Sequence, residues 1–482
     1  MKIFEIKKNM DILNPTEIGI QINDPRLKSS NNGKFIKNIQ NKNFVIPNWP
    51  NFVKDIESIY QTTKTNTSGK VASYIPQLAK VNPSFYGISI CTIDGQILEI
   101  GDTNIFFSIQ SCSKPITYGI SVEDNSEQYV HNFVGREPSG RNFNELCLNH
   151  ENIPHNPLIN SGSIMCVSLI EYKKSQAERF EHIMDYWSKL IGIERIGFSL
   201  STYLSEKNSA DRNFTLAYMM QEKKAFQKGK NEEFTRIWNH DDLKNNLELY
   251  FQCCSIELNC KQMAMIASTL ANGGICPFTS EKVFNNNNVK NILSLIYSCG
   301  MYDYSGEWAY IVGIPAKSGV SGIIFAVIPN VMGIAVYSPP LDDNGNSVRG
   351  IDFFKKFVEV FNFHTFDSLV VNNKKHITKY NKYEETFNTY LLLEASNKND
   401  ILIIKKLIEK GININSTDYD KRTALHIATS SNNLEIVKFL VDNNADMELR
   451  DRWNNRPIDD AIREKFTDII EFFTELKTNK KD

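Results

Sequence analysis

The stretch that decides the fold runs from Phe85 to Val122 and reads FYGISICTIDGQILEIGDTNIFFSIQSCSKPITYGISV. Apolar residues alternate on both sides of Asp94-Gly95, a dipeptide typical of tight β-hairpin turns. This pattern predicts two antiparallel strands, followed by a helix that begins near Ser111. Pro115 then falls in the first helical turn, where its missing N–H has no intrahelical partner to lose.

Ser111 and Lys114 form an S-x-x-K pair at the start of that predicted helix. Residues three apart share one helix face, and the serine stands at the positive end of the helix dipole. A serine hydroxyl is a weak nucleophile until a neighbouring base removes its proton. A lysine serves as that base when burial or cationic neighbours lower its pKa from about 10.4 towards neutrality. Because chance often supplies this spacing, the hypothesis needs a second element.

The second element is Ala316-Lys-Ser-Gly-Val320, at the start of a predicted strand pair, Ser321 to Ile328 and Val331 to Ser338. It resembles the K-[ST]-G strand motif that accompanies S-x-x-K in penicillin-recognising serine enzymes. On an edge strand beside the serine, the backbone N–H groups near Val320 and of Ser111 would form an oxyanion hole. The two motifs together predict an acyl-transfer site.

Composition and charge exclude several function classes. The 54 basic and 56 acidic side chains nearly balance, which gives no excess for binding nucleic acid. Nine cysteines without a C-x-x-C pair indicate reduced thiols in a cytosol-like compartment. Eight dispersed histidines lack metal-ligand spacing, so no metal site is predicted. The uncharged run from Gly319 to Ser338 is broken by Pro329-Asn330 and fits two strands better than a membrane helix.

The first residues, MKIFEIKKNMDILN, resemble neither a secretory signal nor a transit peptide. A cytoplasmic location is therefore expected, with a mitochondrial one left open. Length alone predicts more than one domain. We expect a flexible N-terminal arm at 1–43, a catalytic domain at 44–369, a polar linker at 370–385 and a repeat domain at 386–482.

The repeat domain is recognised by a 33-residue period. Ala395, Ala428 and Ala461 follow this spacing, as do Leu407, Leu440 and Phe473. The segment from Arg422 to Ala428, RTALHIA, resembles the ankyrin signature T-P-L-H-x-A. About three all-α ankyrin units are predicted, and a protein partner for them is expected, although a purely structural appendage remains the alternative.

Ordered blocks over residues 44–366 resemble the serine-dependent glutaminases of the β-lactamase-like fold. The blocks are VIP (45–47), GKVASYIPQLAK (69–80), QSCSKP (110–115), YVH (129–131), GREPSG (135–140), HNPLINSG (155–162), DRN (211–213), YFQ (250–252), LANGG (270–274), CGMYD (299–303) and PAKSGV (315–320). The resemblance implies an α/β (α+β) fold in which helices flank an antiparallel sheet. A helical subdomain is expected between about Ser121 and Lys290.

The resemblance also implies an activity: hydrolysis of L-glutamine to L-glutamate and ammonia through a glutamyl-serine intermediate, without metal or organic cofactor. Ser111 would be the nucleophile, Lys114 its proton partner and Tyr302 an aid to proton transfer, with Val320 in the oxyanion hole. Tyr250 belongs to the same catalytic set. The positions implied for substrate contact are Tyr74, Gln110, Asn160, Glu206, Asn213 and Tyr250. Lys317 is a second-tier site, serving strand geometry as much as catalysis.

The resemblance also implies a homodimer or homotetramer, and the sequence itself leads us to expect no membrane association. The segment from Lys223 to Glu248 looks longer than in the family, and the loop from Ser139 to Asn149 carries Glu145 and Cys147 where relatives differ, which leaves a response to phosphate open. Two alternatives compete with the glutaminase hypothesis. One is a penicillin-binding or β-lactamase-like acyl hydrolase, for which an S-D-N-type motif is missing. The other is an ankyrin scaffold with an inactive enzyme domain.

Overall fold

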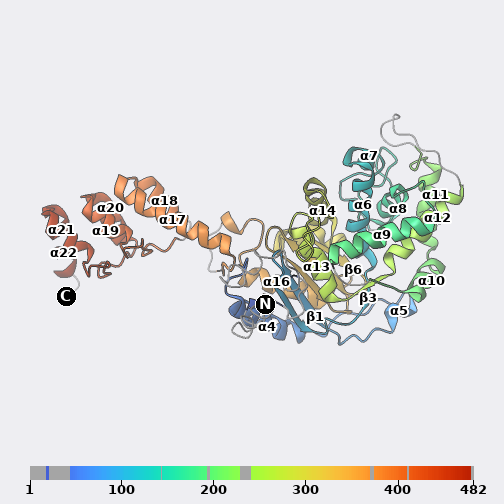
Figure 1. The fold of residues 1–482 in the computed structure, drawn as a ribbon, viewed down its shortest axis with the longest axis horizontal. Coiled ribbons are helices and arrows are strands. Elements are labelled where there is room, and N and C mark those ends of the chain that lie inside the picture. The colour runs from blue at the N-terminus through green and yellow to red at the C-terminus, as the bar shows by residue number, and fades with distance from the viewer. Residues whose placement is uncertain are drawn as a thin grey trace, which may run out of the picture. The chain divides into compact units, whose positions relative to one another are not determined.

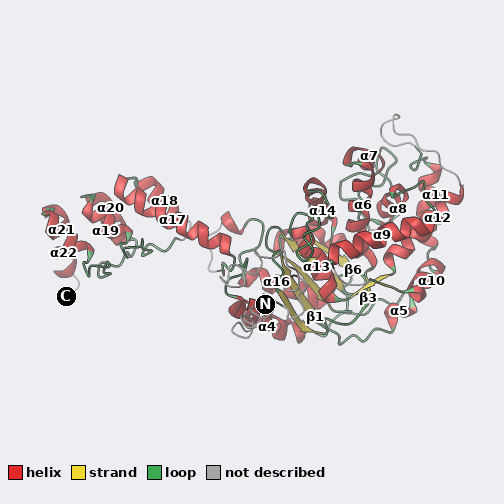
Figure 2. Ribbon diagram, in the orientation of Figure 1, coloured by secondary structure: helices red, strands yellow, loops and turns green. Residues whose placement is uncertain are grey.

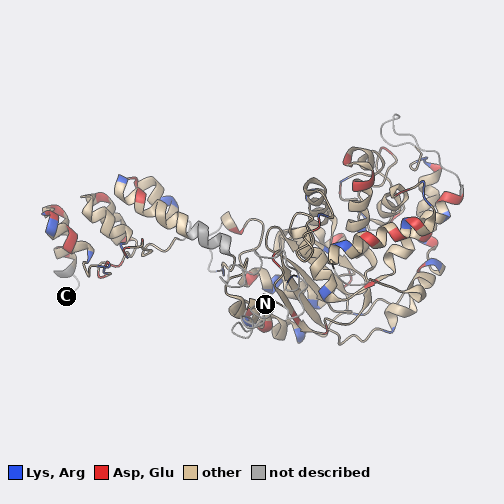
Figure 3. Ribbon diagram, viewed as in Figure 1, with Lys and Arg blue, Asp and Glu red and all other residues tan. Residues whose placement is uncertain are grey.

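The structure is a computed structural model, and it describes residues 18–20, 26, 44–142, 144–192, 196–227, 240–369, 374–409 and 412–478. The chain divides into two compact units, Met1–Thr365 and Phe366–Asp482 (Figure 1). Each unit has its own core. Acidic and basic residues are scattered over both units (Figure 3), and the net charge is −2.

The first unit is built on a five-stranded sheet in the order β2-β1-β8-β7-β6, antiparallel throughout. The predicted hairpin around Asp94-Gly95 is confirmed, because β1 (Gly87–Thr92) pairs with β2 (Ile97–Gly101). The predicted strand pair is also confirmed as β7 (Ile323–Ile328) and β8 (Met332–Tyr337), so the uncharged run is no membrane helix. Within the ranges described, no helix is long and apolar enough to cross a membrane.

Helices cover both faces of this sheet (Figure 2). Gly333 of β8 lies against α13 (Cys260–Ala271), where a Cβ at Gly333 would come within 2.2 Å of the Ser268 backbone nitrogen. Gly350 of α16 (Val348–Val360) lies against Ile324, which pairs with Val336 of β8. Because side chains alternate between faces, positions 333 and 336 point to opposite sides. This two-sided cover explains why β1, β7 and β8 are buried along their whole length.

The predicted helical subdomain is present and supplies most of the remaining helices, but α13 lies inside the span expected for it and packs on the sheet instead. They are α6 (Lys114–Asn125), α7 (Glu127–Phe133), α8 (Asn160–Leu169), α9 (Gln176–Ile191), α10 (Leu200–Asn208), α11 (Asp211–Glu222), α12 (His240–Cys254) and α14 (Asn286–Cys299). A small sheet, β3 (Phe107–Ser108), β5 (Ile256–Leu258) and β4 (Gly197–Phe198), was not foreseen from the sequence. Of the segment that looked longer than in relatives, residues 228–239 lie outside the described part.

Helix α4 (Trp49–Lys64) packs against α16 and the edge strand β2, and two short helices complete the unit: α5 (Pro76–Ala79) and α15 (Ser305–Ile311). Most of the N-terminal arm predicted at 1–43 lies outside the described residues. Within it, Ile18 and Ile20 are buried, and Arg26 donates to the Asp94 carbonyl at 2.8 Å. These described positions therefore pack on the first hairpin.

The second unit consists of three helix pairs: α17 (Lys379–Lys398) with α18 (Ile401–Glu409), α19 (Ala424–Ser430) with α20 (Leu434–Asp442), and α21 (Pro457–Glu464) with α22 (Thr467–Thr478). The alanines and the large apolar residues of the 33-residue period are all buried in its core. Thr423 caps α19 through a reciprocal bond with His426. Helix α17 begins inside the segment expected to be a linker, and the division between the units precedes residue 369.

Candidate active site

The Ser111–Lys114 pair lies where the sheet meets the helical layer. The helix predicted to begin near Ser111 begins instead at Lys114, and the serine occupies a preceding 3-10 turn, η2 (Gln110–Ser113). Such tighter turns are common at helix starts. The Lys114 Nζ donates to the Ser111 Oγ at 2.9 Å. The pair therefore has the geometry for direct proton transfer that the S-x-x-K spacing predicted.

Burial changes the pKa of Lys114, the lysine of this pair. Lys114 is 1% exposed, and its ammonium also donates to the Asn160 Oδ1 at 2.8 Å. Burial lowers the pKa of Lys114 to about 8, because a desolvated ammonium is disfavoured. The Ser111 hydroxyl and the Asn160 amide accept hydrogen bonds from this ammonium, and the nearby Glu206 carboxylate opposes the lowering of its pKa only in part. The neutral, basic form of Lys114 is therefore accessible near physiological pH.

The K-S-G segment forms its own strand, β6 (Ala316–Gly319), at the edge of the sheet and against η2. The Cys112 Sγ donates to the Lys317 carbonyl at 3.6 Å. At Gly319, a Cβ would lie 2.9 Å from the Ile109 carbonyl oxygen, so only glycine permits this close approach. The predicted position of the motif on an edge strand beside the serine is confirmed. Val320 follows directly on this strand.

Tyr302 is joined to the same centre. It begins the 3-10 turn η3 (Tyr302–Tyr304) with φ of 53°, a conformation that non-glycine residues rarely adopt. Burial raises the pKa of Tyr302 above its ordinary value, and a hydrogen bond with Ser111 opposes the rise. A left-handed backbone held at a functional position is strain that the surrounding packing must maintain. The Tyr302 phenol therefore interacts with Ser111, the nucleophile candidate.

Lys317, which the sequence analysis treated as a second-tier site, contacts the segment that carries Tyr302. Its Nζ lies over the Tyr302 ring, 4.4 Å from the centroid, and donates to the Gly300 carbonyl at 3.0 Å. Burial lowers the pKa of Lys317 to about 7. This lysine thus fixes the segment that carries Tyr302, and its contact with the ring is a cation–π interaction when it is protonated. The K-S-G motif identified Lys317 as a candidate residue, but it did not predict the contact with the Tyr302 ring.

The residues implied for substrate binding form two linked groups. In the first, the Tyr74 hydroxyl donates to the Glu206 Oε1 at 2.7 Å, and the Gln110 Nε2 donates to the same oxygen at 3.0 Å. Burial raises the pKa of Glu206, whereas these two hydrogen bonds lower it. In the second, the Asn160 Nδ2 donates to the Asn213 Oδ1 at 2.9 Å. Asn160 joins the second group to Lys114.

Tyr250, on α12, lies beside the first of these groups. Burial raises the pKa of Tyr250 well above its ordinary value, and the nearby Cys254 and Glu206 raise it further. Cys254 is a site neighbour that the sequence analysis missed, since a cysteine one helical turn from Tyr250 carries no motif. Burial raises the pKa of the Cys254 thiol to about 12, so the thiol stays protonated.

A cavity of about 520 Å³ lies beside Tyr302. It is lined in part by the loop from Ser139 to Asn149, which the sequence analysis singled out. Its walls include Arg141, Asn156 and Cys299 as well as Tyr302. Arg141 forms an exposed ion pair with Glu145 at 2.7 Å, one of the two residues in this loop where relatives differ.

A serine bound to a buried lysine on one side and a K-S-G edge strand on the other is the arrangement of S-x-x-K hydrolases. Comparison with known proteins shows which family within this class the chain resembles. The glutaminase family profile matches residues 69–366, and an ankyrin-repeat profile of three copies matches residues 367–482. The chain belongs to the glutaminase family, whose members are amidohydrolases. It carries ankyrin repeats in addition.

Individual relatives agree with the family match. The chain is 45% identical over 431 residues to the mitochondrial liver isoform of glutaminase from Mus musculus, covering 89% of this chain and 70% of the mouse protein. A solved structure described as the probable glutaminase ybaS is 33% identical, with a TM-score of 0.59, over 64% of this chain and 96% of that one. A crystal structure of Mglu in its glutamate form is 34% identical, with a TM-score of 0.60, over 65% of this chain and 69% of that one.

Proposed function

We propose that this chain hydrolyses L-glutamine to L-glutamate and ammonia through a glutamyl-serine intermediate. The observation that carries the proposal is the 2.9 Å contact between the Lys114 Nζ and the Ser111 Oγ, together with the lowered pKa of that lysine. A base whose pKa lies close to the working pH is efficient in both directions of proton transfer. The related structure of Mglu in its glutamate form supports the choice of product.

In the first half-reaction, neutral Lys114 takes the proton from the Ser111 Oγ, which attacks the side-chain amide carbon of glutamine. The carbonyl oxygen becomes an oxyanion, which the backbone N–H groups of Ser111 and Val320 would stabilise by about 3 kcal/mol each. The C–N bond then breaks, and the departing nitrogen receives a proton through Tyr302 or Lys114 and leaves as ammonia. The result is an ester between the glutamyl group and Ser111.

In the second half-reaction, water attacks that ester. Lys114 removes one proton from the water, the tetrahedral intermediate collapses, and the proton returns to the Ser111 Oγ as glutamate leaves. Both halves use the same base and the same oxyanion donors. The bond broken in the first half is the amide bond, and the bond broken in the second half is the ester bond, so the enzyme is regenerated.

The proposed binding mode follows from the charges of glutamine. Its ammonium group is placed against Glu206, whose Oε1 already accepts two hydrogen bonds from Tyr74 and Gln110. Its carboxylate is placed against the hydroxyl and amide donors of Tyr250, Asn160 and Asn213. A charged ligand enters a buried site only when each of its groups finds a partner, so this polar lining favours a small zwitterion over an apolar amide.

Ammonia release from L-glutamine by the purified chain tests the proposal. We expect steady release by the wild type and a loss of at least about 10³-fold in Ser111→Ala. Mass spectrometry of a rapidly quenched reaction should find a glutamyl adduct on wild-type protein and none on the variant. Undiminished release by Ser111→Ala would reject the serine mechanism. Hydrolysis of a β-lactam in place of glutamine would favour the penicillin-type alternative, and no release at all would favour an inactive scaffold.

Three further expectations accompany this proposal. We propose a homodimer or homotetramer, which sedimentation of the purified chain measures, and a cytoplasmic location, which imaging of a C-terminally tagged chain measures. We also propose that the ankyrin unit binds a protein partner. The support for the partner is a pair of exposed aromatic side chains on adjacent repeat loops, Tyr419 at 94% exposed and Trp453 at 56%.

A further inference from the structure

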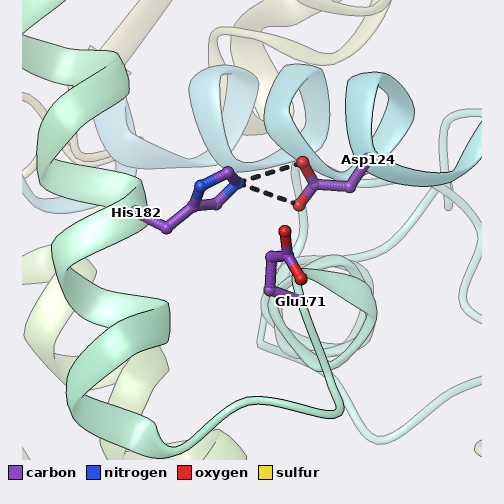
Figure 4. Close-up of side chains that lie close together, drawn as sticks. All are labelled: Asp124, Glu171 and His182. Carbon is purple, nitrogen blue, oxygen red and sulfur yellow. Dashed lines mark hydrogen bonds and ion pairs between the residues drawn. The ribbon is translucent and has the colours of Figure 1, made fainter.

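Three potential metal ligands from different segments of the first unit converge in the helical subdomain (Figure 4). They are Asp124 in the last turn of α6, Glu171 directly after α8, and His182 on α9. One ligand atom from each lies within 4.8 Å of the other two. The His182 Nε2 contacts both carboxylate oxygens of Asp124, at 3.0 and 3.3 Å.

Buried side chains fix the backbone that carries these three residues. Arg179, one turn before His182 on α9, is 5% exposed and donates to the carbonyls of Val167 and Ile170 at 2.7 and 2.8 Å, just before Glu171. Asn125 donates to the Leu169 carbonyl at 3.1 Å, which joins the end of α6 to the end of α8. The three helix segments are thus held in register by contacts that do not use the ligand atoms themselves.

The charges around the cluster leave a place for a cation. Two carboxylates lie side by side, and the Asp124 side chain is only 11% exposed. Lys174 approaches Glu171 at 3.0 Å from the solvent side, with its own side chain 45% exposed. An ion bound by both carboxylates would neutralise them where Lys174 reaches only one.

We propose that Asp124, Glu171 and His182 form a binding site for a divalent zinc-type metal ion, separate from the catalytic residues. An imidazole nitrogen with two carboxylate oxygens is a donor set that Zn²⁺ accepts, whereas Mg²⁺ and Ca²⁺ prefer oxygen ligands alone. Tetrahedral Zn²⁺ at about 2.1 Å from each ligand places neighbouring ligand atoms about 3.4 Å apart. A side-chain movement of Glu171, which is 31% exposed, would bring the three ligand atoms to this spacing.

The position of the site gives it a structural consequence. Helix α6 starts at Lys114 and ends beside Asp124, so the ion would fix the far end of the helix that begins with the proposed base. Metal binding to the folded state alone stabilises that state. The sequence analysis predicted no metal site because these three residues have no local spacing. They are brought together only by the packing of α6, α8 and α9.

Titration of the full-length chain with ZnCl₂ tests the site, after chelator treatment and removal of the chelator. We expect one equivalent to bind, a rise in the midpoint of thermal unfolding, and at least tenfold weaker binding in both His182→Ala and Glu171→Gln. Because Glu171 is partly exposed, its substitution keeps the fold even if His182→Ala does not. Glutamine hydrolysis by each variant, at the wild-type rate, checks that the fold is intact.

Matched controls come from exposed positions outside the cluster. Asp185→Asn removes an exposed carboxylate from α9, and His150→Ala removes an exposed imidazole from a loop, so both should bind zinc like the wild type. Co²⁺ in place of Zn²⁺ identifies the ligands: we expect visible bands without the intense near-ultraviolet absorption of a thiolate complex. Equal zinc affinity in Glu171→Gln and wild type, or a thiolate band, would overturn the proposal.

Discussion

The buried charged residues Lys114, Lys317 and Asp460 have different surroundings in the two units. In the catalytic unit, Lys114 and Lys317 are buried among hydroxyl, amide and carbonyl groups, and burial lowers the pKa of each, to about 8 and about 7. In the ankyrin unit, the 2% exposed side chain of Asp460 is paired with Arg422 at 3.4 Å and Arg463 at 2.7 Å. A buried lysine becomes a reactive group when desolvation outweighs its charged neighbours, whereas a buried carboxylate in direct contact with an opposite charge makes a structural link. Four predictions test this contrast.

The largest effect is expected at the proposed base. Lys114→Met should lower kcat for glutamine by about 10²- to 10⁴-fold, because it removes proton transfer to and from Ser111. The fold should persist, since the lowered pKa means that the buried lysine costs stability: the cost grows as the pH falls from about 10.5 to about 8, is complete below about 8, and is removed in the variant. Steady-state ammonia release and thermal unfolding measure both. Lys189→Met, at an exposed ion pair of α9, is the control, and a near-normal rate in Lys114→Met would show that another base serves.

The next effect concerns the ankyrin core. Leu440 is fully buried there, so Leu440→Ala should lower the free energy of unfolding of this unit by about 2–5 kcal/mol. The kcat/KM for glutamine should stay within about twofold of wild type, because the site residues all lie in the other unit. Urea denaturation followed by circular dichroism measures the first, and initial rates the second. Leu402→Ala, at a position 67% exposed, should change neither quantity, and a parallel fall in kcat/KM would break the contrast between the units.

A smaller effect is expected at the proposed ammonium partner. Glu206→Gln keeps the size of the side chain but removes its charge, so KM for glutamine should rise by about 10- to 100-fold. The loss should appear mainly in KM, because the ammonium lies away from the reacting amide. Initial rates over a range of glutamine concentrations separate the two constants. Glu257→Gln, a partly buried glutamate on β5, is the matched control, and a fall in kcat with unchanged KM would reject this binding mode.

The smallest effect is the pH dependence of the wild type. Lys114 must be neutral to accept a proton, and its pKa is about 8, so kcat/KM should rise with increasing pH up to about 8 and then level off. Below that value the rise should approach tenfold for each pH unit. Initial rates between about pH 6 and pH 9 measure the curve. A rate independent of pH across this range would contradict the assignment of Lys114 as the base.

Local sequence patterns were enough to predict most of the fold and the centre of the site. The Asp94-Gly95 hairpin, the β7–β8 pair and the 33-residue repeat each depend on residues close in sequence, and each was predictable. The contact of Ser111 with Lys114 is likewise a local one. The glutaminase resemblance named the pocket residues, and the structure brings Tyr74, Gln110 and Glu206 into one hydrogen-bonded group.

What escaped prediction depends on contacts between distant segments. The Lys317 ammonium meets the Tyr302 ring only because β6 and η3 pack together, and Cys254 reaches the site through the packing of α12. The cluster of Asp124 and His182 joins two helices whose sequences carry no ligand spacing. Hydrophobic periodicity locates such helices but does not say which polar side chains will face one another.

The backbone conformation of Gln110 limits which substitutions can be used to study this residue, which directly precedes Ser111. Its φ of 50° is poorly tolerated by branched side chains, so Gln110→Val would disturb the main chain that positions Ser111 as well as delete an amide. Gln110→Asn keeps an amide and a side chain that tolerates this conformation, and Gln110→Gly keeps the conformation alone. Kinetics of that pair would separate what the amide does for glutamine from what the turn does for the serine.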